Sequence, residues 1–219
     1  MSASMAHYLG GLYRLGGHDS FISSSAVANE VEVTPPAAAR MFGRLEAVGL
    51  VEREPYRGVR LTGRGAQEAL REIRSHRLSE AFLVRVLGYG WHEAHDLADH
   101  LAEIGDDDFV DRMEAKAGYP RRCPHGEPIP SRDGKLAALN DLPLTELAKG
   151  EHGTISRVRI RDSAKLEYLA KEGLLPETGF RVEGKAPFGG PIRLRLGNHE
   201  VVLGAEIAGK LWVERRAAA

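Results

Sequence analysis

The chain has 219 residues, of which 42% are hydrophobic and 28% charged, and its formal net charge is −1. Such a length allows one large domain or two to three small ones, and the composition excludes a fibrous or disordered protein. No apolar run approaches the roughly eighteen residues of a membrane span, and MSASMAHYLGG at the start lacks the features of a signal peptide, so we expect a cytoplasmic protein without membrane contact.

The first 62 residues predict three helices and a β-hairpin. Apolar residues recur at helical spacing over residues 4–15, and a second helix follows the serines of 23–24, which can cap its free N–H groups. A third helix begins in VTPPAAAR with Thr34 as N-cap and prolines in its first turn, and Gly49 ends it. The two short helices and the tight turn between them predict a helix-turn-helix.

The hairpin that follows, LVEREPYRGVRLTGRG, has the form of a wing. Its arginines Arg53, Arg57 and Arg60 would lie beside DNA phosphates if the third helix entered a major groove. The same geometry also occurs in proteins that never touch DNA, so the pattern alone leaves both readings open.

The middle of the chain is acidic, with twelve acidic and seven basic side chains in residues 63–120. It begins with a long amphipathic helix over about 62–88. The stretch WHEAHDLADHLAEIGDDD predicts the next helix, and DDDFVDRMEAKAG predicts another with Asp106 to Asp108 at its start, where carboxylates suit the helix dipole. We interpret residues 119–130 as a structural loop that breaks regular structure.

Two helical patterns in this region carry potential metal ligands. His95, Asp99 and Glu103 recur every four residues, and His76 and Glu80 form a similar pair on the preceding helix. If the helices pack side by side, His76, Glu80 and His95 can form one cluster. Nitrogen and oxygen donors suit Mn(II) or Fe(II). The alternative is a merely solvated polar helix face.

Other chemistry finds little support in the sequence. A single cysteine, Cys123, excludes an internal disulfide and a thiolate zinc cluster, so we expect any metal to be held by histidine and carboxylate. No nucleophile elbow or phosphate-binding loop is present. A Cys123–His125 nucleophile is conceivable, but along an extended chain we expect these two side chains to point in different directions.

The last seventy or so residues contain short alternating runs separated by Gly, Pro and Asn, with one helical insertion, SAKLEYLAKEG. They predict a small β-barrel, preceded by LNDLPLTELAKGE as a linker. The fold class is therefore multidomain α+β: a winged helix-turn-helix in 1–62, a helical metal-binding and dimerisation domain in 63–140, and an SH3-like barrel in 141–219.

The order of HRLSE, CPHGEPIP and GLLPETGFRV…APFGGPI resembles the diphtheria-toxin-repressor family of iron- and manganese-dependent transcriptional regulators, of the manganese transport regulator type. The barrel resembles the ferrous-iron transport protein A family. The resemblance covers essentially the whole chain. It implies a homodimeric repressor of metal-uptake genes, not an enzyme, in which bound metal favours the conformation that binds a palindromic operator in double-stranded DNA.

The resemblance also assigns metal ligands. The family's ancillary site falls on His76, Glu80 and His95. Its primary site falls less regularly on His7, Asp99 and Glu103, because Ala102 occupies a position where a carboxylate is expected; His100 or Asp96 could compensate. No sulfur ligand is carried over, so we expect Mn(II) first and Fe(II) next. Some family members add ligands from the barrel to the ancillary site, but the matching stretch here, ISRVRI, contains no carboxylate or amide side chain.

For DNA, the resemblance places contacts on the third helix and the wing, where an arginine can reach a guanine edge or a phosphate. The matched residues are Thr34, Pro36, Ala37 and Arg40, with Arg44 nearby and Arg57 and Arg60 in the wing.

Two other classes of function remain open at this point. A metalloenzyme would use the same histidines and carboxylates with an open coordination position, and a general base beside the site would favour it. A non-DNA-binding interaction protein would grip a partner peptide with its barrel.

Overall fold

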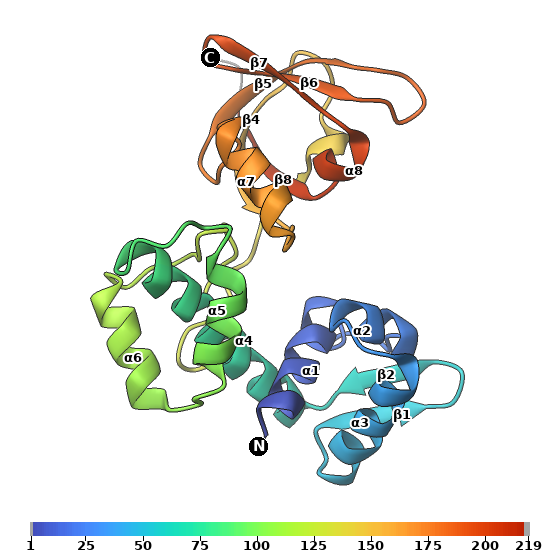
Figure 1. The fold of residues 1–219 in the computed structure, drawn as a ribbon. Helices are drawn as coiled ribbons and strands as arrows, with labels where there is room; N and C mark the ends of the chain where they lie inside the picture. Colours follow the sequence, from blue (N-terminus) through green and yellow to red (C-terminus); the bar gives the residue numbers. More distant parts are fainter. Residues whose placement is uncertain (1, 217–219) are drawn as a thin grey trace.

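The computed structural model describes residues 2–216, which form three units along the chain (Figure 1). The first unit packs three helices against a two-stranded antiparallel hairpin around a core that includes Leu9, Leu12, Phe42 and Leu45. Its elements are α1 (Ala3–Arg14), α2 (Ser24–Glu30), α3 (Pro35–Ala47), β1 (Val51–Glu54) and β2 (Gly58–Leu61).

The ends of these helices follow the local sequence. The side chain of Ser23 accepts a hydrogen bond from the N–H of Ala26, as predicted for the start of α2. Thr34 occupies the N-cap position of α3, but its side chain makes no capping bond, and prolines fill the first positions of that helix. Gly49 has φ +71°, a left-handed conformation that glycine adopts without strain and that ends α3.

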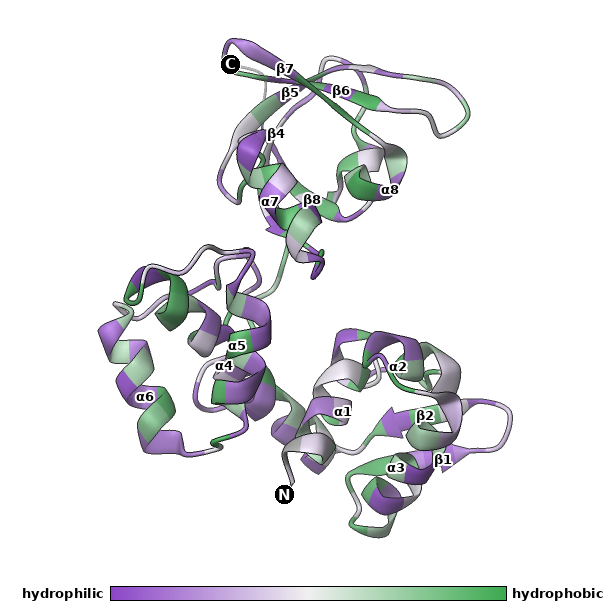
Figure 2. Cartoon of the chain, viewed as in Figure 1, coloured by the Kyte–Doolittle hydropathy of each residue, from purple (hydrophilic) through white to green (hydrophobic). Residues whose placement is uncertain are grey.

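The second unit consists of α4 (Gly63–Arg85), α5 (Ala94–Ala102) and α6 (Asp107–Lys116). Asp106 caps α6 by accepting from the N–H of Phe109, so the acidic run does start a helix. Figure 2 shows hydrophilic and hydrophobic residues alternating along α6, as expected for a helix with one buried face. Helix α5 is shorter than predicted, because Trp91 to Glu93 form a turn before it.

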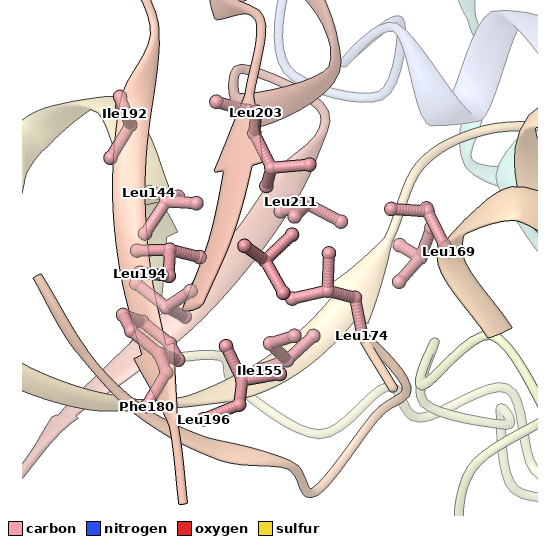
Figure 3. Packing of buried hydrophobic residues seen from close by; sticks show 14 of the residues in the cluster. Leu144, Ile155, Leu169, Leu174, Phe180, Ile192, Leu194, Leu196, Leu203 and Leu211 are labelled. Carbon is pink, nitrogen blue, oxygen red and sulfur yellow. The ribbon is translucent and has the colours of Figure 1, made fainter. Parts of the chain in front are cut away.

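The third unit is a six-stranded antiparallel sheet with the strand order β3-β8-β4-β5-β6-β7, curled around an aliphatic core (Figure 3). The stretch expected to be a linker, residues 139–151, contains β3 and a short 3-10 helix, and Leu144 and Leu147 are fully buried in that core. The elements are β3 (Leu142–Pro143), η1 (Leu144–Glu146), β4 (His152–Val158), α7 (Ser163–Lys171), β5 (Gly179–Lys185), β6 (Ile192–Leu196), β7 (His199–Leu203), α8 (Ala205–Ala208) and β8 (Leu211–Arg216).

The sheet is joined to both other units. The backbone N–H of Val158 in β4 donates to the carbonyl of His125, 2.9 Å away, in the loop after α6. Arg161 donates to the carbonyl and the carboxylate of Glu30 at the end of α2, each at 3.0 Å. Among the described residues, no helix is both long and apolar enough to cross a membrane.

Candidate metal centre

Helices α4 and α5 bring the side chains of His76, Glu80 and His95 together, as the spacing predicts. Glu80 Oε1 lies 3.1 Å from His76 Nε2 and 3.1 Å from His95 Nδ1, and the two imidazole nitrogens are 3.2 Å apart. The four-residue repeat places His76 and Glu80 on one face of α4, and that face packs against α5. Three donor atoms therefore converge on one point between the helices.

This cluster is shielded from solvent, which makes its charges interact strongly. Burial alone would lower the pKa of His76, but the Glu80 carboxylate and the hydrogen bonds to Asp99 and Glu80 raise it to about 10. Burial alone would raise the pKa of Glu80, but the charges of His76 and His125 hold it well below its ordinary value. Without a bound cation, His76 carries the positive charge that Glu80 needs.

Asp99 lies against this cluster rather than in a separate one. Its Oδ1 is 2.9 Å from His76 Nδ1, so the two ring nitrogens of His76 face different carboxylates. Burial would raise the pKa of Asp99, but the hydrogen bond from His76 and the charge of that imidazole lower it to about 2. Asp99 thus positions the His76 ring besides offering an oxygen of its own.

The remaining expected primary-site residues are not gathered into one cluster of donors. His7 on α1 is half-buried and burial lowers its pKa, which the charge of Asp99 opposes; among the described residues, no hydrogen bond or ion pair joins His7 to Asp99 or Glu103. His100 is exposed, and its Nδ1 lies 2.7 Å from the backbone carbonyl of Asp96. These contacts do not support His100 or Asp96 as the compensating ligand for Ala102.

Cys123 and His125 are metal-ligand candidates that the sequence analysis missed. Their donor atoms and a Glu80 oxygen lie within 4.8 Å of one another, and His125 Nδ1 is 3.3 Å from Glu80 Oε1. Burial, followed by the charge of Glu80, raises the pKa of the Cys123 thiol well above its ordinary value. Glu80 therefore belongs to two groups of donors.

The prediction that the two side chains diverge along an extended chain is wrong, because the chain turns here. The N–H of Gly126 donates to the carbonyl of Cys123 at 2.9 Å, and Gly126 has φ +85°. His125 Nε2 lies 3.0 Å from the carbonyl of Trp91, whose ring stacks on the imidazole. The usable signal in the sequence was the turn glycine after Cys-Pro-His.

The donor set fits a divalent cation. Two imidazole nitrogens and one carboxylate oxygen, from His76, Glu80 and His95, lie within 4.8 Å of one another. Asp99 contacts the other ring nitrogen of His76 and so orients that imidazole. The group of Glu80, Cys123 and His125 adds a sulfur, so the expected sulfur-free donor set describes only the first group. All of these ligand positions are given by residues of the second unit.

The exposed face of α3 carries the predicted DNA contacts. Arg40 and Arg44 are exposed, and within residues 2–216 neither guanidinium pairs with a carboxylate, whereas the wing arginines do: Arg57 with Glu54 at 2.7 Å and Arg60 with Glu52 at 2.6 Å. Thr34, Pro36 and Ala37 lie at the N-terminal end of the same helix, where the two prolines carry no N–H and leave the N–H of Ala37 as the first helical donor for a phosphate.

Known proteins resemble this chain both in sequence and in the arrangement of its three units. Residues 1–59 match the family model described as iron dependent repressor, N-terminal DNA binding domain, and residues 62–131 match the iron dependent repressor metal binding and dimerisation domain. A solved structure titled manganese-dependent transcriptional repressor complex with manganese is 32% identical, with a TM-score of 0.89 over 97% of this chain and 100% of that one. The chain belongs to the diphtheria toxin repressor family.

Further relatives agree with this membership. The iron-dependent repressor IdeR of Mycobacterium leprae (strain TN) is 27% identical over 95% of each chain. The solved structure of ScaR with bound Zn²⁺ is 32% identical, with a TM-score of 0.81 over 97% of this chain and 99% of that one. Residues 142–215 match the FeoA domain, which confirms the SH3-like C-terminal unit. As a diphtheria toxin repressor family member, the chain is a metal-dependent, DNA-binding transcriptional repressor and not an enzyme.

Proposed function

We propose that this repressor responds to Mn(II), with Fe(II) as the next ion, and represses metal-uptake genes as a homodimer on a palindromic operator. The observation that carries the proposal is the convergence of His76, Glu80 and His95, because this set of nitrogen and oxygen donors suits either ion. The solved relative in complex with manganese supports the first choice.

The contacts of the cluster suggest how metal and DNA binding are coupled. A bound divalent cation would supply the positive charge that His76 carries in its absence. His76 also contacts Asp99, and the charge of Asp99 acts on His7 in α1. Binding of a cation at the cluster would therefore change the electrostatic environment of the first helix of the DNA-binding unit. A conformation of α1 favoured by the loaded cluster would orient α3 in both subunits of a dimer.

A homodimer is supported by apolar side chains that remain open on the single chain. Leu97 on α5 and Ile104 just after it are exposed by 38% and 55% of their surface, and Leu87 after α4 by 55%. All three lie within residues 62–131, which match the family's metal binding and dimerisation domain, and this match supports a homodimer in which another chain covers them. The two-fold symmetry of such a dimer predicts an operator with two inverted half-sites.

A fluorescence-anisotropy titration tests this proposal. The full chain is incubated with labelled promoter DNA of a metal-transporter gene while free Mn(II) is raised from a chelated start. We expect tight binding only with Mn(II), and loss of at least about tenfold in affinity for His76→Ala, since even supporting residues of a metal site contribute that much. His100→Ala, which removes an exposed imidazole, is the matched control. Binding that ignores both metal and chelator would contradict the proposal.

A further inference from the structure

Helices α4 and α5 run past each other in a register that extends beyond the described cluster. Glu80 contacts His95 at 3.1 Å, and one turn back along α4 His76 contacts Asp99 at 2.9 Å, one turn forward along α5. The two helices are thus antiparallel, and each move of four residues towards the start of α4 corresponds to a move of four residues towards the end of α5. Continued by one more turn, this register places Glu103 opposite Glu72.

The structure places these two residues around one cavity. A space of about 430 Å³ is lined by Glu72 and Ser75 of α4, by Ala102 and Glu103 at the end of α5, and by Ala6 of α1. Ala102 is the position at which the family resemblance leads us to expect a carboxylate. Its methyl group offers no oxygen, so Glu103 is the carboxylate that the end of α5 brings to the cavity.

Glu72 brings into this region an oxygen that forms no hydrogen bond with any described residue. Its Oε2 is shielded from solvent and has no hydrogen-bond partner within the described part of the chain, and the same holds for Ser75 Oγ. Burial raises the pKa of the Glu72 carboxyl, although the charges of Arg14 and His76 oppose this. A carboxylate oxygen that is shielded from solvent and unpaired is unfavourable, so its retention indicates a ligand.

Helix α1 makes room for this side chain. A Cβ atom on Gly10 would lie 2.1 Å from Glu72 Oε2, so a side chain at position 10 would displace the carboxylate. Arg14, one turn further along α1, already pairs with Glu30 at 2.8 Å and forms no ion pair with Glu72 within the described residues. The Glu72 carboxylate therefore lies between α1, α4 and α5, and its Oε2 has no hydrogen-bond partner among the described residues.

We propose that Glu72 supplies, from α4, the carboxylate that α5 lacks at Ala102, and that it binds a second divalent cation together with Asp99 and Glu103. This rests on the proposed response of the repressor to Mn(II), to which it adds a ligand particular to this chain. Three carboxylates make the site harder than the group containing Cys123, so a hard cation such as Mn(II) is the expected occupant.

The test counts Mn(II) bound to the full chain, with free Mn(II) followed by electron paramagnetic resonance. We expect Glu72→Gln to lose one bound ion per chain, or to bind it at least about tenfold more weakly, as loss of a ligand requires. Glu167→Gln is the matched control, because Glu167 on α7 does not line this cavity and pairs with Lys171 at 2.8 Å. It should bind as many ions as the natural protein, with unchanged affinity.

A second variant separates ligation from packing. Adding Ala102→Glu to Glu72→Gln returns a carboxylate to the same cavity from the other helix, and it should restore the lost ion. Unchanged Mn(II) stoichiometry and affinity in Glu72→Gln would overturn the proposal. So would a loss that Ala102→Glu does not restore, accompanied by a lower melting temperature of the metal-free protein.

These outcomes are distinct from failure of the metal dependence itself. If the natural protein binds its operator equally with and without Mn(II), the proposed function fails whatever Glu72 does. If operator binding needs Mn(II) and is lost in Glu80→Gln, while Glu72→Gln binds as many ions as the natural protein, only the role of Glu72 is wrong.

Discussion

His76 is held by carboxylates on both ring nitrogens, Glu80 at 3.1 Å and Asp99 at 2.9 Å, and this decides how metal binding depends on pH. Its pKa of about 10 means that the ring is protonated at neutral pH in the metal-free protein. A metal ligand must be a neutral imidazole, so binding has to displace this proton. The ion pair also stabilises the metal-free fold below the ordinary histidine pKa, and that contribution is lost as pH rises through about 10.

We therefore predict that Mn(II) affinity increases by about tenfold per pH unit near neutrality, the slope for one displaced proton. Calorimetry in two buffers with different protonation enthalpies would detect the released proton directly. His100→Gln removes an exposed imidazole and should keep the slope, whereas His76→Gln should weaken binding and flatten it. An affinity that stays constant with pH in the natural protein would show that the ion displaces no proton from His76.

At the scale of elements, the turn that carries Cys123 and His125 is fixed by its contact with β4. Gly126 has φ +85°, and a Cβ atom there would lie 2.0 Å from the carbonyl oxygen of Ser156. The neighbouring backbone bond from Val158 to the His125 carbonyl ties the same turn to the sheet. The second group of donors around Glu80 depends on this docking.

Gly126→Ala should therefore lower the melting temperature and weaken metal binding together. A non-glycine residue in the left-handed region costs about 1–3 kcal/mol, and the collision with Ser156 adds to that cost. Gly134→Ala is the matched control, since Gly134 has φ +73° but its nearest neighbour to an added Cβ is 3.9 Å away. Thermal unfolding with and without Mn(II) measures both effects; equal losses in the two variants would show that the β4 contact is unimportant.

The two donor groups also show what sequence patterns can predict. His76, Glu80 and His95 follow from helical spacing on two helices that are adjacent in the chain, and the structure brings them together. The return of His125 to Glu80 depends on the path of an irregular loop and on its docking to β4, which no local periodicity encodes. Likewise, the contact of Asp99 with His76 depends on how far α5 is shifted along α4.

In the fold, too, local features could be predicted from the sequence, whereas features that depend on long-range packing could not. Helix caps such as Ser23 and Asp106, and the alternation of the sheet strands, are local features and were predictable. The stretch 139–151 read as a linker because its buried residues Leu144 and Leu147 are spaced neither as a long helix nor as a long strand. Their burial is decided by the surrounding strands.

For the whole molecule, the sheet and the DNA-binding unit are joined through one carboxylate. Arg161 follows β4, and it donates to Glu30 of α2, whose carboxylate also accepts from Arg14 of α1 at 2.8 Å. These side chains are partly buried, with 20% to 34% of their surface exposed, so solvent screens the interaction only in part. The C-terminal unit therefore restrains the position of the helix-turn-helix.

Arg161→Ala should release this restraint without unfolding either unit. We expect a larger maximum dimension by small-angle X-ray scattering and faster amide exchange at the C-terminal end of α2, because one partner of Glu30 is removed. Lys165→Ala is the matched control: Lys165 pairs at 2.8 Å with Glu206, and both belong to the C-terminal unit. A scattering curve and exchange pattern of Arg161→Ala that match those of Lys165→Ala would mean that the sheet does not hold the DNA-binding unit, and that its docking depends on the second unit alone.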